Sequence, residues 1–168
     1  AVSLPLAALA MALTVVLALA AGLYAAQRHG KLGDVGVMAA SQVGIAIPNF
    51  WFAILLVLLF AVHLGWVNAT GFPGWTEDEG GGLAEGLLAL LLPAVALAVV
   101  QAAILARVTR SAVLEVMRED FVRTARAKGL TRRQALWRHV LRNALIPVLT
   151  VAGLQLGNLI TGAIVVEN

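Results

Sequence analysis

The chain contains no cysteine, and charged residues make up only 12% of its 168 residues. The absence of cysteine excludes a disulfide framework and a thiolate metal site. Soluble domains carry roughly 25% charged residues. A share this low, combined with 61% hydrophobic residues and a mean hydropathy of +0.91, excludes an ordinary soluble domain and indicates a membrane protein.

Motifs of enzymes and nucleotide-binding proteins are missing as well. The sequence holds no GxxxxGK[ST] phosphate loop, so this chain is not expected to bind ATP by that route. Its three histidines are scattered along the chain, which does not predict a metal cluster. We therefore predict no catalytic residues, no metal site and no cofactor bound by this chain.

Four apolar segments are long enough to cross a bilayer core, for which about 20 residues suffice. The predicted spans are residues 4–26, 37–62, 87–106 and 144–166. Pro48 removes one backbone hydrogen bond from the second span, which predicts a kink or local unwinding there. The predicted fold is an all-α polytopic membrane protein, with residues 1–168 forming part of one transmembrane domain.

Basic residues are distributed unevenly over the segments between these spans. Ten of the twelve Lys and Arg residues lie from Arg107 to Arg142, and the other two are Arg28 and Lys31. Residues 63–86 carry acids but no Lys or Arg. Because cytoplasmic loops are enriched in basic residues, we predict that 27–34 and 107–143 are cytoplasmic and that 63–86 is external. Residues 27–34 are expected to form a solvated turn that closes at Asp34.

The basic segment 107–143 has the pattern of two short helices that meet at a glycine. On the first helix, helical spacing predicts one apolar stripe made of Leu114, Met117, Phe121 and Ala125. Gly129 ends this helix, where a chain commonly leaves through a left-handed conformation. Thr131 and Gln134 have the spacing of a capping box that begins the second helix. One side of that helix is expected to hold Leu136, Trp137, Val140, Leu141, Ala144 and Leu145.

This segment resembles the cytoplasmic EAA loop of bacterial ABC-importer permeases, whose pattern is E-A-A, three residues, G, nine residues, then I-x-L-P. Ala125, Gly129 and Leu141 occupy the last Ala, the Gly and the Leu of that pattern. The chain departs from it at the positions of Glu, Ile and the first Pro, which are Arg123, His139 and Arg142. These departures match the version in permeases for dipeptides, oligopeptides and nickel, to which segments 44–60 and 153–168 are also similar. Since such permeases continue past the position of Asn168, we expect a fragment.

The resemblance implies a permease subunit of an ATP-driven importer in the bacterial inner membrane, for peptides or a related small solute such as nickel. The implied partners are ABC ATPase subunits that bind ATP, a second permease subunit, an extracytoplasmic substrate-binding protein and membrane lipid, but no nucleic acid. Coupling to the ATPase would involve Met117, Phe121, Arg123, Thr124, Ala125, Lys128, Gly129, Leu136, Trp137 and Leu141.

Four amide side chains in or beside the spans are candidates for the translocation path: Asn49, Gln101, Gln155 and Asn158. Amides in hydrocarbon tend to face protein or a water-filled route, and joining neighbouring helices explains them equally well. Gly153 and Gly157 have the small-xxx-small spacing that lets two membrane helices approach closely.

Two other classes of function stay open. An ion-coupled secondary transporter is disfavoured because none of the four predicted spans contains an acidic or basic side chain. A membrane-anchored protein that binds anionic lipid or nucleic acid is allowed by the arginine density of the loop. Against that reading, the loop alternates its charges with two ordered apolar stripes and has no exposed aromatic platform.

Overall fold

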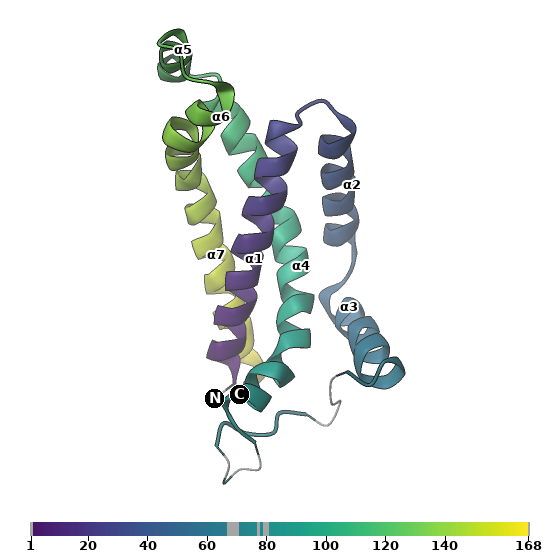
Figure 1. The fold of residues 1–168 in the computed structure, drawn as a ribbon. Coiled ribbons are helices and arrows are strands. Elements are labelled where there is room, and N and C mark those ends of the chain that lie inside the picture. The colour runs from purple at the N-terminus through teal and green to yellow at the C-terminus, as the bar shows by residue number, and fades with distance from the viewer. Residues whose placement is uncertain (1, 67–70, 77, 79–80, 168) are drawn as a thin grey trace.

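A computed structural model describes residues 2–66, 71–76, 78 and 81–167, with the backbone alone described from 162 to 167. All regular structure in this part of the chain is helical, which confirms the predicted all-α class. The longest helices are α1 (Ser3–Gln27), α4 (Leu83–Val116) and α7 (Leu141–Glu167), which run along one another, with α2 (Leu32–Ala46) beside them (Figure 1). The shorter elements are α3 (Asn49–Leu56), the π-helical turn η1 (Val57–His63), α5 (Asp120–Ala127), α6 (Arg132–Ala135) and the π-helical turn η3 (Leu136–Val140).

Among the described residues, three helices are long and apolar enough to cross a membrane: Ser3–Gln27, Leu83–Val116 and Arg132–Thr161. The segments Leu32–Ala46 and Asn49–His63 meet this test only as a pair, because they are bent by 99° at the break between them. Ile47 and Pro48 both have extended backbones, with ψ of 124° and 132°. Proline disfavours a helical conformation in the residue before it, so the interruption predicted at Pro48 is confirmed. The predicted second span, 37–62, is therefore two helices.

The helix α4 is longer than the predicted span 87–106, because it continues to Val116. The first part of the predicted loop 107–143 thus extends α4 as a helix. Leu114 belongs to α4, whereas Phe121 and Ala125 belong to α5, so the predicted single stripe from Leu114 to Ala125 is wrong. Glu119 has an extended backbone (φ −66°, ψ 149°) and begins the new helix, and the apolar spacing happens to continue across this break.

The contact between α1 and α4 is the most extensive between any two helices and uses small side chains. Every fourth residue along one side of α1 is small and buried: Ala10, Thr14, Ala18, Gly22 and Ala26. The same spacing recurs on α4 in Ala94, Ala98, Ala102 and Ala106. Small side chains let two helix backbones approach closely, which is a principal source of association between helices in lipid.

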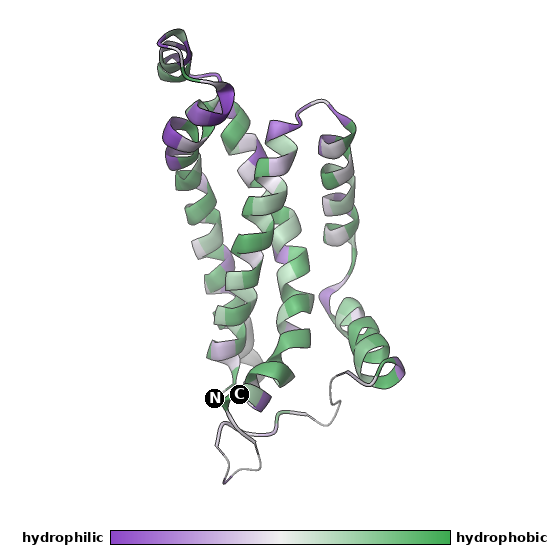
Figure 2. Cartoon of the chain, viewed as in Figure 1, coloured by the Kyte–Doolittle hydropathy of each residue, from purple (hydrophilic) through white to green (hydrophobic). Residues whose placement is uncertain are grey.

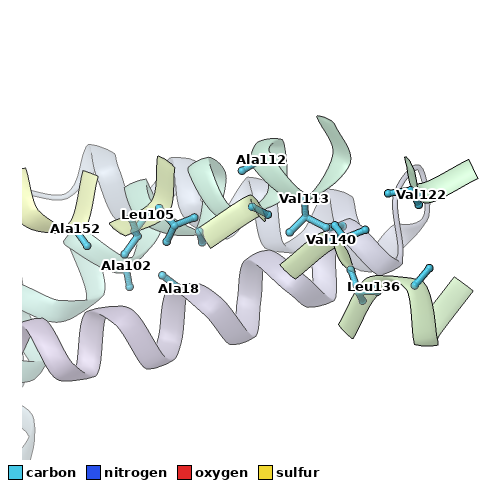
Figure 3. Packing of buried hydrophobic residues seen from close by; sticks show 14 of the residues in the cluster. Ala18, Ala102, Leu105, Ala112, Val113, Val122, Leu136, Val140 and Ala152 are labelled. Carbon is cyan, nitrogen blue, oxygen red and sulfur yellow. The ribbon is translucent and has the colours of Figure 1, made fainter. Parts of the chain in front are cut away.

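A cluster of larger apolar side chains continues from this contact toward α5 and α6. In Figure 3, Val113 of α4 lies beside Val140 and Leu136, Val122 lies beyond them, and Leu105 belongs to the same cluster farther along α4. All five are at most 4% exposed. The cluster therefore anchors the short helices of the basic segment to the long helices of the bundle.

Both basic segments lie at the same end of the bundle, where the α1–α2 turn and the α5–α6 corner are found (Figure 1). The N-terminus, the end of α7 and the α3–α4 connection lie at the opposite end. Hydrophilic residues gather around the α5–α6 corner, while the long helices are mostly hydrophobic (Figure 2). We refer to the end formed by residues 28–31 and 117–138 as the basic end. Residues 67–70, 77 and 79–80 of the predicted external loop lie outside the described residues.

Candidate functional site

The corner between α5 and α6 turns at Gly129, whose φ is +97°. The N–H of Leu130 donates to the Ala125 carbonyl at 3.3 Å, and the N–H of Gly129 donates to the Arg126 carbonyl at 3.0 Å. These two bonds form a Schellman motif, the common way in which a helix ends at a glycine. The positive φ predicted for Gly129 is confirmed. A Cβ at this position would meet no atom within 4 Å, so the backbone conformation alone explains the glycine.

The helix that follows starts with the predicted capping box. The N–H of Thr131 donates to Gln134 Oε1 at 2.9 Å, and the N–H of Gln134 donates to Thr131 Oγ1 at 3.3 Å. Each side chain thus satisfies a backbone donor that the first helical turn leaves free. The Schellman motif and the capping box together fix the direction in which α5 projects from the bundle.

The helix α5 is held from one side and exposed on the others. Val122, at 1% exposure, is its one buried residue and belongs to the core cluster. Phe121 is 43% exposed, and Trp137, just beyond the corner, is 52% exposed. Around them lie the exposed basic residues Arg118, Arg123, Arg126, Lys128, Arg132, Arg133 and Arg138. The corner therefore presents two large aromatic side chains among basic residues. The expectation that this loop has no exposed aromatic side chains is wrong, because the core takes up Val122 and Leu136 and leaves Phe121 and Trp137 at the surface.

The other predicted coupling residues divide between interior and surface. Leu136 is only 4% exposed and packs in the core cluster, so the expectation that it faces the same side as Trp137 is corrected. Only the middle of the predicted apolar side packs in the core, and Trp137, at the edge of that side, is exposed. Thr124 is exposed, and its Oγ1 donates to the Asp120 carbonyl at 3.0 Å. Lys128 is exposed too, whereas the half-buried residues are Met117, Ala125 and Leu141.

Asp34 differs most from its prediction, because the sequence predicts a solvated turn there and the residue is only 4% exposed. It lies in the first turn of α2, where the guanidinium of Arg110 binds both of its carboxylate oxygens. The Arg110 Nη2–Asp34 Oδ2 distance is 2.7 Å, and the N–H of Gly30 donates to the same oxygen at 3.0 Å. A buried carboxylate requires such partners, because an unpaired buried charge is strongly destabilising. Asp34 is the only acid in residues 27–34, but spacing along the chain gives no sign of its pairing with Arg110.

A groove of about 660 Å³ lies beside this ion pair, between the α1–α2 turn and α5. It is lined by His29 of the α1–α2 turn, by Arg110, Ser111, Leu114 and Glu115 of α4, by Arg118 and Glu119, and by Asp120 and Arg123 of α5. Arg110 of the ion pair and the first turn of α5 therefore border the same space.

The four amide residues predicted for the translocation path do not lie together in the fold. Gln155 is 6% exposed, and its Nε2 donates to the Gln101 carbonyl at 3.2 Å, which joins α7 to α4. Its Oε1 is buried without a hydrogen-bond partner among the described residues. Asn49 and Asn158 are exposed on α3 and α7. Gln155 therefore joins two helices, as the alternative explanation of the amides predicts. Asn49 and Asn158 stay predictions for the translocation path.

The two glycines of α7 are not used for packing within the described part of the chain. A Cβ on Gly153 or Gly157 would meet no atom within 4 Å, and both residues are exposed. The close helix approach that their spacing predicts occurs instead between α1 and α4. The sequence signal that could have found it is the four-residue repeat of small residues from Ala10 to Ala26 and from Ala94 to Ala106.

The fold and the corner define a multi-pass membrane protein that presents a basic helix–turn–helix at one end of its bundle. The chain belongs to the family described as binding-protein-dependent transport system inner membrane component, whose model matches residues 18–168.

Relatives of the chain are named as peptide permeases. It is 45% identical over 165 residues to the di/tripeptide transport system permease protein DppB of Pseudomonas aeruginosa (strain UCBPP-PA14), covering 89% of this chain and 49% of the relative. It is 41% identical over 146 residues to the oligopeptide transport system permease protein AppB of Bacillus subtilis (strain 168), covering 87% and 46%. It is 35% identical over 187 residues to the dipeptide transport system permease protein DppB of Escherichia coli (strain K12), covering 98% and 54%. The chain spans about half the length of the curated relatives it matches.

Proposed function

We propose that the chain forms part of the permease subunit of an ATP-driven importer in the bacterial inner membrane. Its solute is a peptide or a related small solute such as nickel. The family description supports a transport component that works with a binding protein, and the names of the relatives support peptides. In this proposal the chain performs no catalysis, and ATP is bound and hydrolysed by separate ATPase subunits.

The observation that carries the proposal is the exposed corner at the basic end, whose turn is formed by a Schellman motif and a capping box. Phe121 and Trp137 can enter an apolar groove on a protein partner, while the surrounding arginines set register and exclude wrong partners. The partner that we propose is the cytoplasmic ATPase. In this proposal the residues that contact the ATPase are Phe121, Arg123, Thr124, Lys128 and Trp137. The residues that set the direction of α5 are Met117, Ala125, Gly129, Leu136 and Leu141.

Further partners follow from surfaces that the described residues leave open. Neither α3 nor η1 contains a buried residue, and large apolar side chains such as Phe50 and Val62 are 70% and 67% exposed. Gly153 and Gly157 lie exposed on α7. We assign these surfaces to membrane lipid and to a second permease subunit, identical or different. An extracytoplasmic binding protein would deliver solute at the end opposite the basic end.

The ordered corner favours a protein partner over an anionic lipid or a nucleic acid. A lipid or nucleic-acid surface requires positive charge, but it does not require a helix held at one angle by a Schellman motif and a capping box. An ion-coupled carrier is disfavoured because the charged pair seen between helices, Asp34 and Arg110, lies at the basic end and is mutually neutralised.

The test uses the full-length permease together with its ATPase and binding protein. Trp137→Ala is compared with Trp66→Ala. Trp66 is also exposed, at 72%, but it belongs to the connection between η1 and α4, which lies at the end opposite the basic end. We expect Trp137→Ala to weaken ATPase recovery about tenfold or more, as truncation of a central interface tryptophan commonly does. Trp66→Ala should leave ATPase recovery unchanged. Equal recovery with both variants would contradict docking at the corner.

A further inference from the structure

The helix α2 is attached to the bundle mainly by polar and small residues. Its buried residues are Asp34, Ser41 and Gly44, and none of them is a large apolar side chain. Lipid tails are as apolar as leucine, so apolar contact alone does little to hold one helix against another in a membrane. Specific contacts at these few positions must therefore fix where α2 lies.

Asp34 provides the strongest of these contacts. Both of its oxygens bind Arg110 of α4, and the Gly30 amide and the His29 ring complete its surroundings. His29 Nδ1 lies 3.2 Å from Asp34 Oδ2 and 3.0 Å from Arg110 Nη2. This nitrogen can donate to Asp34 or accept from Arg110, but it cannot do both at once. The bidentate Asp34–Arg110 pair is thus the constant element of the cluster.

The segment that follows has little else to hold it. Gly30, with φ +75°, lies in the turn before α2, and the 99° bend lies between α2 and α3. Neither α3 nor η1 has a buried residue. Elements with few buried contacts are those that shift most readily. The position of α2 and α3 therefore depends on how α2 is attached at the basic end.

The Asp34–Arg110 pair lies close to the part of α4 that carries α5. Arg110 precedes the end of α4 at Val116 by less than two turns, and only Met117, Arg118 and Glu119 separate α4 from α5. Arg110 also borders the same groove as Asp120 and Arg123 of α5. A displacement of α5 that moves the end of α4 will therefore act on Arg110 directly.

We infer that Asp34 and Arg110 are positioning residues for transport, which tie α2 and α3 to the end of α4 so that movement of α5 reaches them. The inference rests on the proposed function, in which an ATPase moves α5. The two residues make no contact with solute or nucleotide in this scheme. They keep α2 in register with α4 while the corner moves.

The first experiment reconstitutes the full-length permease with its ATPase and binding protein in liposomes. Asp34→Asn and Arg110→Gln each remove one charge, and the double variant D34R/R110D restores the pair in reverse. Arg107→Gln is the matched control, since Arg107 also joins α4 to α2, through Gln42 at 2.9 Å, but in an exposed pair. The readouts are solute uptake, ATP hydrolysis and the amount of ATPase bound.

For Asp34→Asn and Arg110→Gln we expect uptake per ATP hydrolysed to fall about tenfold or more, because removal of one partner strands a buried charge. ATPase binding should stay at the unmodified level. The reversed pair should recover part of the uptake, and Arg107→Gln should stay close to the unmodified protein. Unmodified uptake in Asp34→Asn would overturn the inference. If the unmodified protein binds no ATPase, the proposed function itself is contradicted.

A second experiment includes a comparison of oxidised with reduced protein that does not depend on the stability of the charge variants. A Cβ on Gly44 would lie 3.2 Å from the Cβ of Ala103, close to the range that a disulfide spans. Cysteines at Gly44 and Ala103 can therefore lock α2 to α4. If the two helices move as one unit, the oxidised variant should transport like the reduced one, and it should restore uptake to Asp34→Asn. Transport that stops on oxidation and returns on reduction would show that α2 must separate from α4, which would overturn the inference.

Discussion

A Cβ on Gly22 would lie 2.6 Å from the Cβ of Thr109, so α1 and α4 meet at a point where only glycine fits. The Ala106 carbonyl would lie 2.8 Å from the same Cβ. Rotation of a side chain relieves neither contact, because the Cβ of Thr109 and the Ala106 carbonyl are both fixed by the backbone of α4. This contact fixes the separation of the two helices with the most extensive contact in the bundle.

Gly22→Val is therefore expected to destabilise the full-length protein by about 1–3 kcal/mol, the usual effect of overpacking a close contact. Gly36→Val in α2 is the control, since a Cβ there would meet no atom within 4 Å. Both changes place the same β-branched residue in a helix, so the difference between them isolates the contact. Stability is measured by SDS titration of purified protein. Equal shifts for the two variants would show that α1 and α4 do not pack this closely.

A second prediction separates the two neighbouring apolar residues of α5. Val122→Ala should release α5 from the core cluster and destabilise the corner by about 1–3 kcal/mol, because it leaves a cavity. Phe121→Ala removes an exposed side chain and should leave the corner in place. Limited trypsin digestion reports the difference, since Arg123, Arg126 and Lys128 lie on or beside α5. Faster cleavage with Phe121→Ala than with Val122→Ala would contradict this assignment.

The amides of α7 are expected to respond differently to the same change. Gln155→Leu removes the hydrogen bond to Gln101 but also removes a buried, unpartnered Oε1. The two effects oppose each other, and polar contacts between membrane helices contribute only about 1 kcal/mol, so stability should change little. Asn158→Leu alters an exposed position and should change uptake or solute preference instead. Unchanged uptake with Asn158→Leu would remove this residue from the path.

The orientation of the chain gives a fourth prediction. Single cysteines at Lys31 and Arg133, both exposed at the basic end, should react only with reagents applied from the cytoplasmic side. A cysteine at Asp78, exposed in the segment 63–86, should react from outside in intact cells. Labelling of Asp78 from the cytoplasmic side would reverse the orientation and remove the ATPase from reach of the corner.

Local features of the chain were predictable wherever the cause is local. Gly129 and the Thr131–Gln134 capping box follow from residue types a few positions apart, and the break at Pro48 follows from the covalent ring of proline. The helical class follows from apolar runs longer than soluble domains contain. In each case the determining interactions are made within one or two helical turns.

Pairings between distant segments could not be predicted in the same way. Asp34 and Arg110 are 76 positions apart, and the sequence carries no mark of which arginine the carboxylate meets. The small-residue repeats of α1 and α4 are present in the sequence, but the glycine spacing predicts a close helix approach at Gly153 and Gly157 instead. The apolar spacing continues across residues 117–119 and predicts one helix, although α4 ends at Val116 and α5 begins at Asp120. Side-chain periodicity does not report the backbone torsion angles at which a helix ends.

The last prediction concerns Gly129, where backbone conformation can be tested apart from packing. Gly129→Val introduces a branched residue at φ +97°, a strain of about 1–3 kcal/mol, without any atom within 4 Å of its Cβ. Gly82→Val is the matched control, because Gly82 is equally free of neighbours but has an extended backbone with φ −163°. Membrane insertion depends on apolar length and loop charge, which neither change affects.

We therefore expect Gly129→Val to reach the membrane at a near-normal level, to bind less ATPase and to transport poorly. Gly82→Val should match the unmodified protein in ATPase recovery. The measurements are quantitative blotting of membranes, ATPase recovery on the tagged permease and solute uptake. The two variants differ in the backbone conformation that they disturb. If Gly129→Val transports at the unmodified rate with normal ATPase recovery, the direction of α5 does not control coupling, and docking at this corner loses its main support.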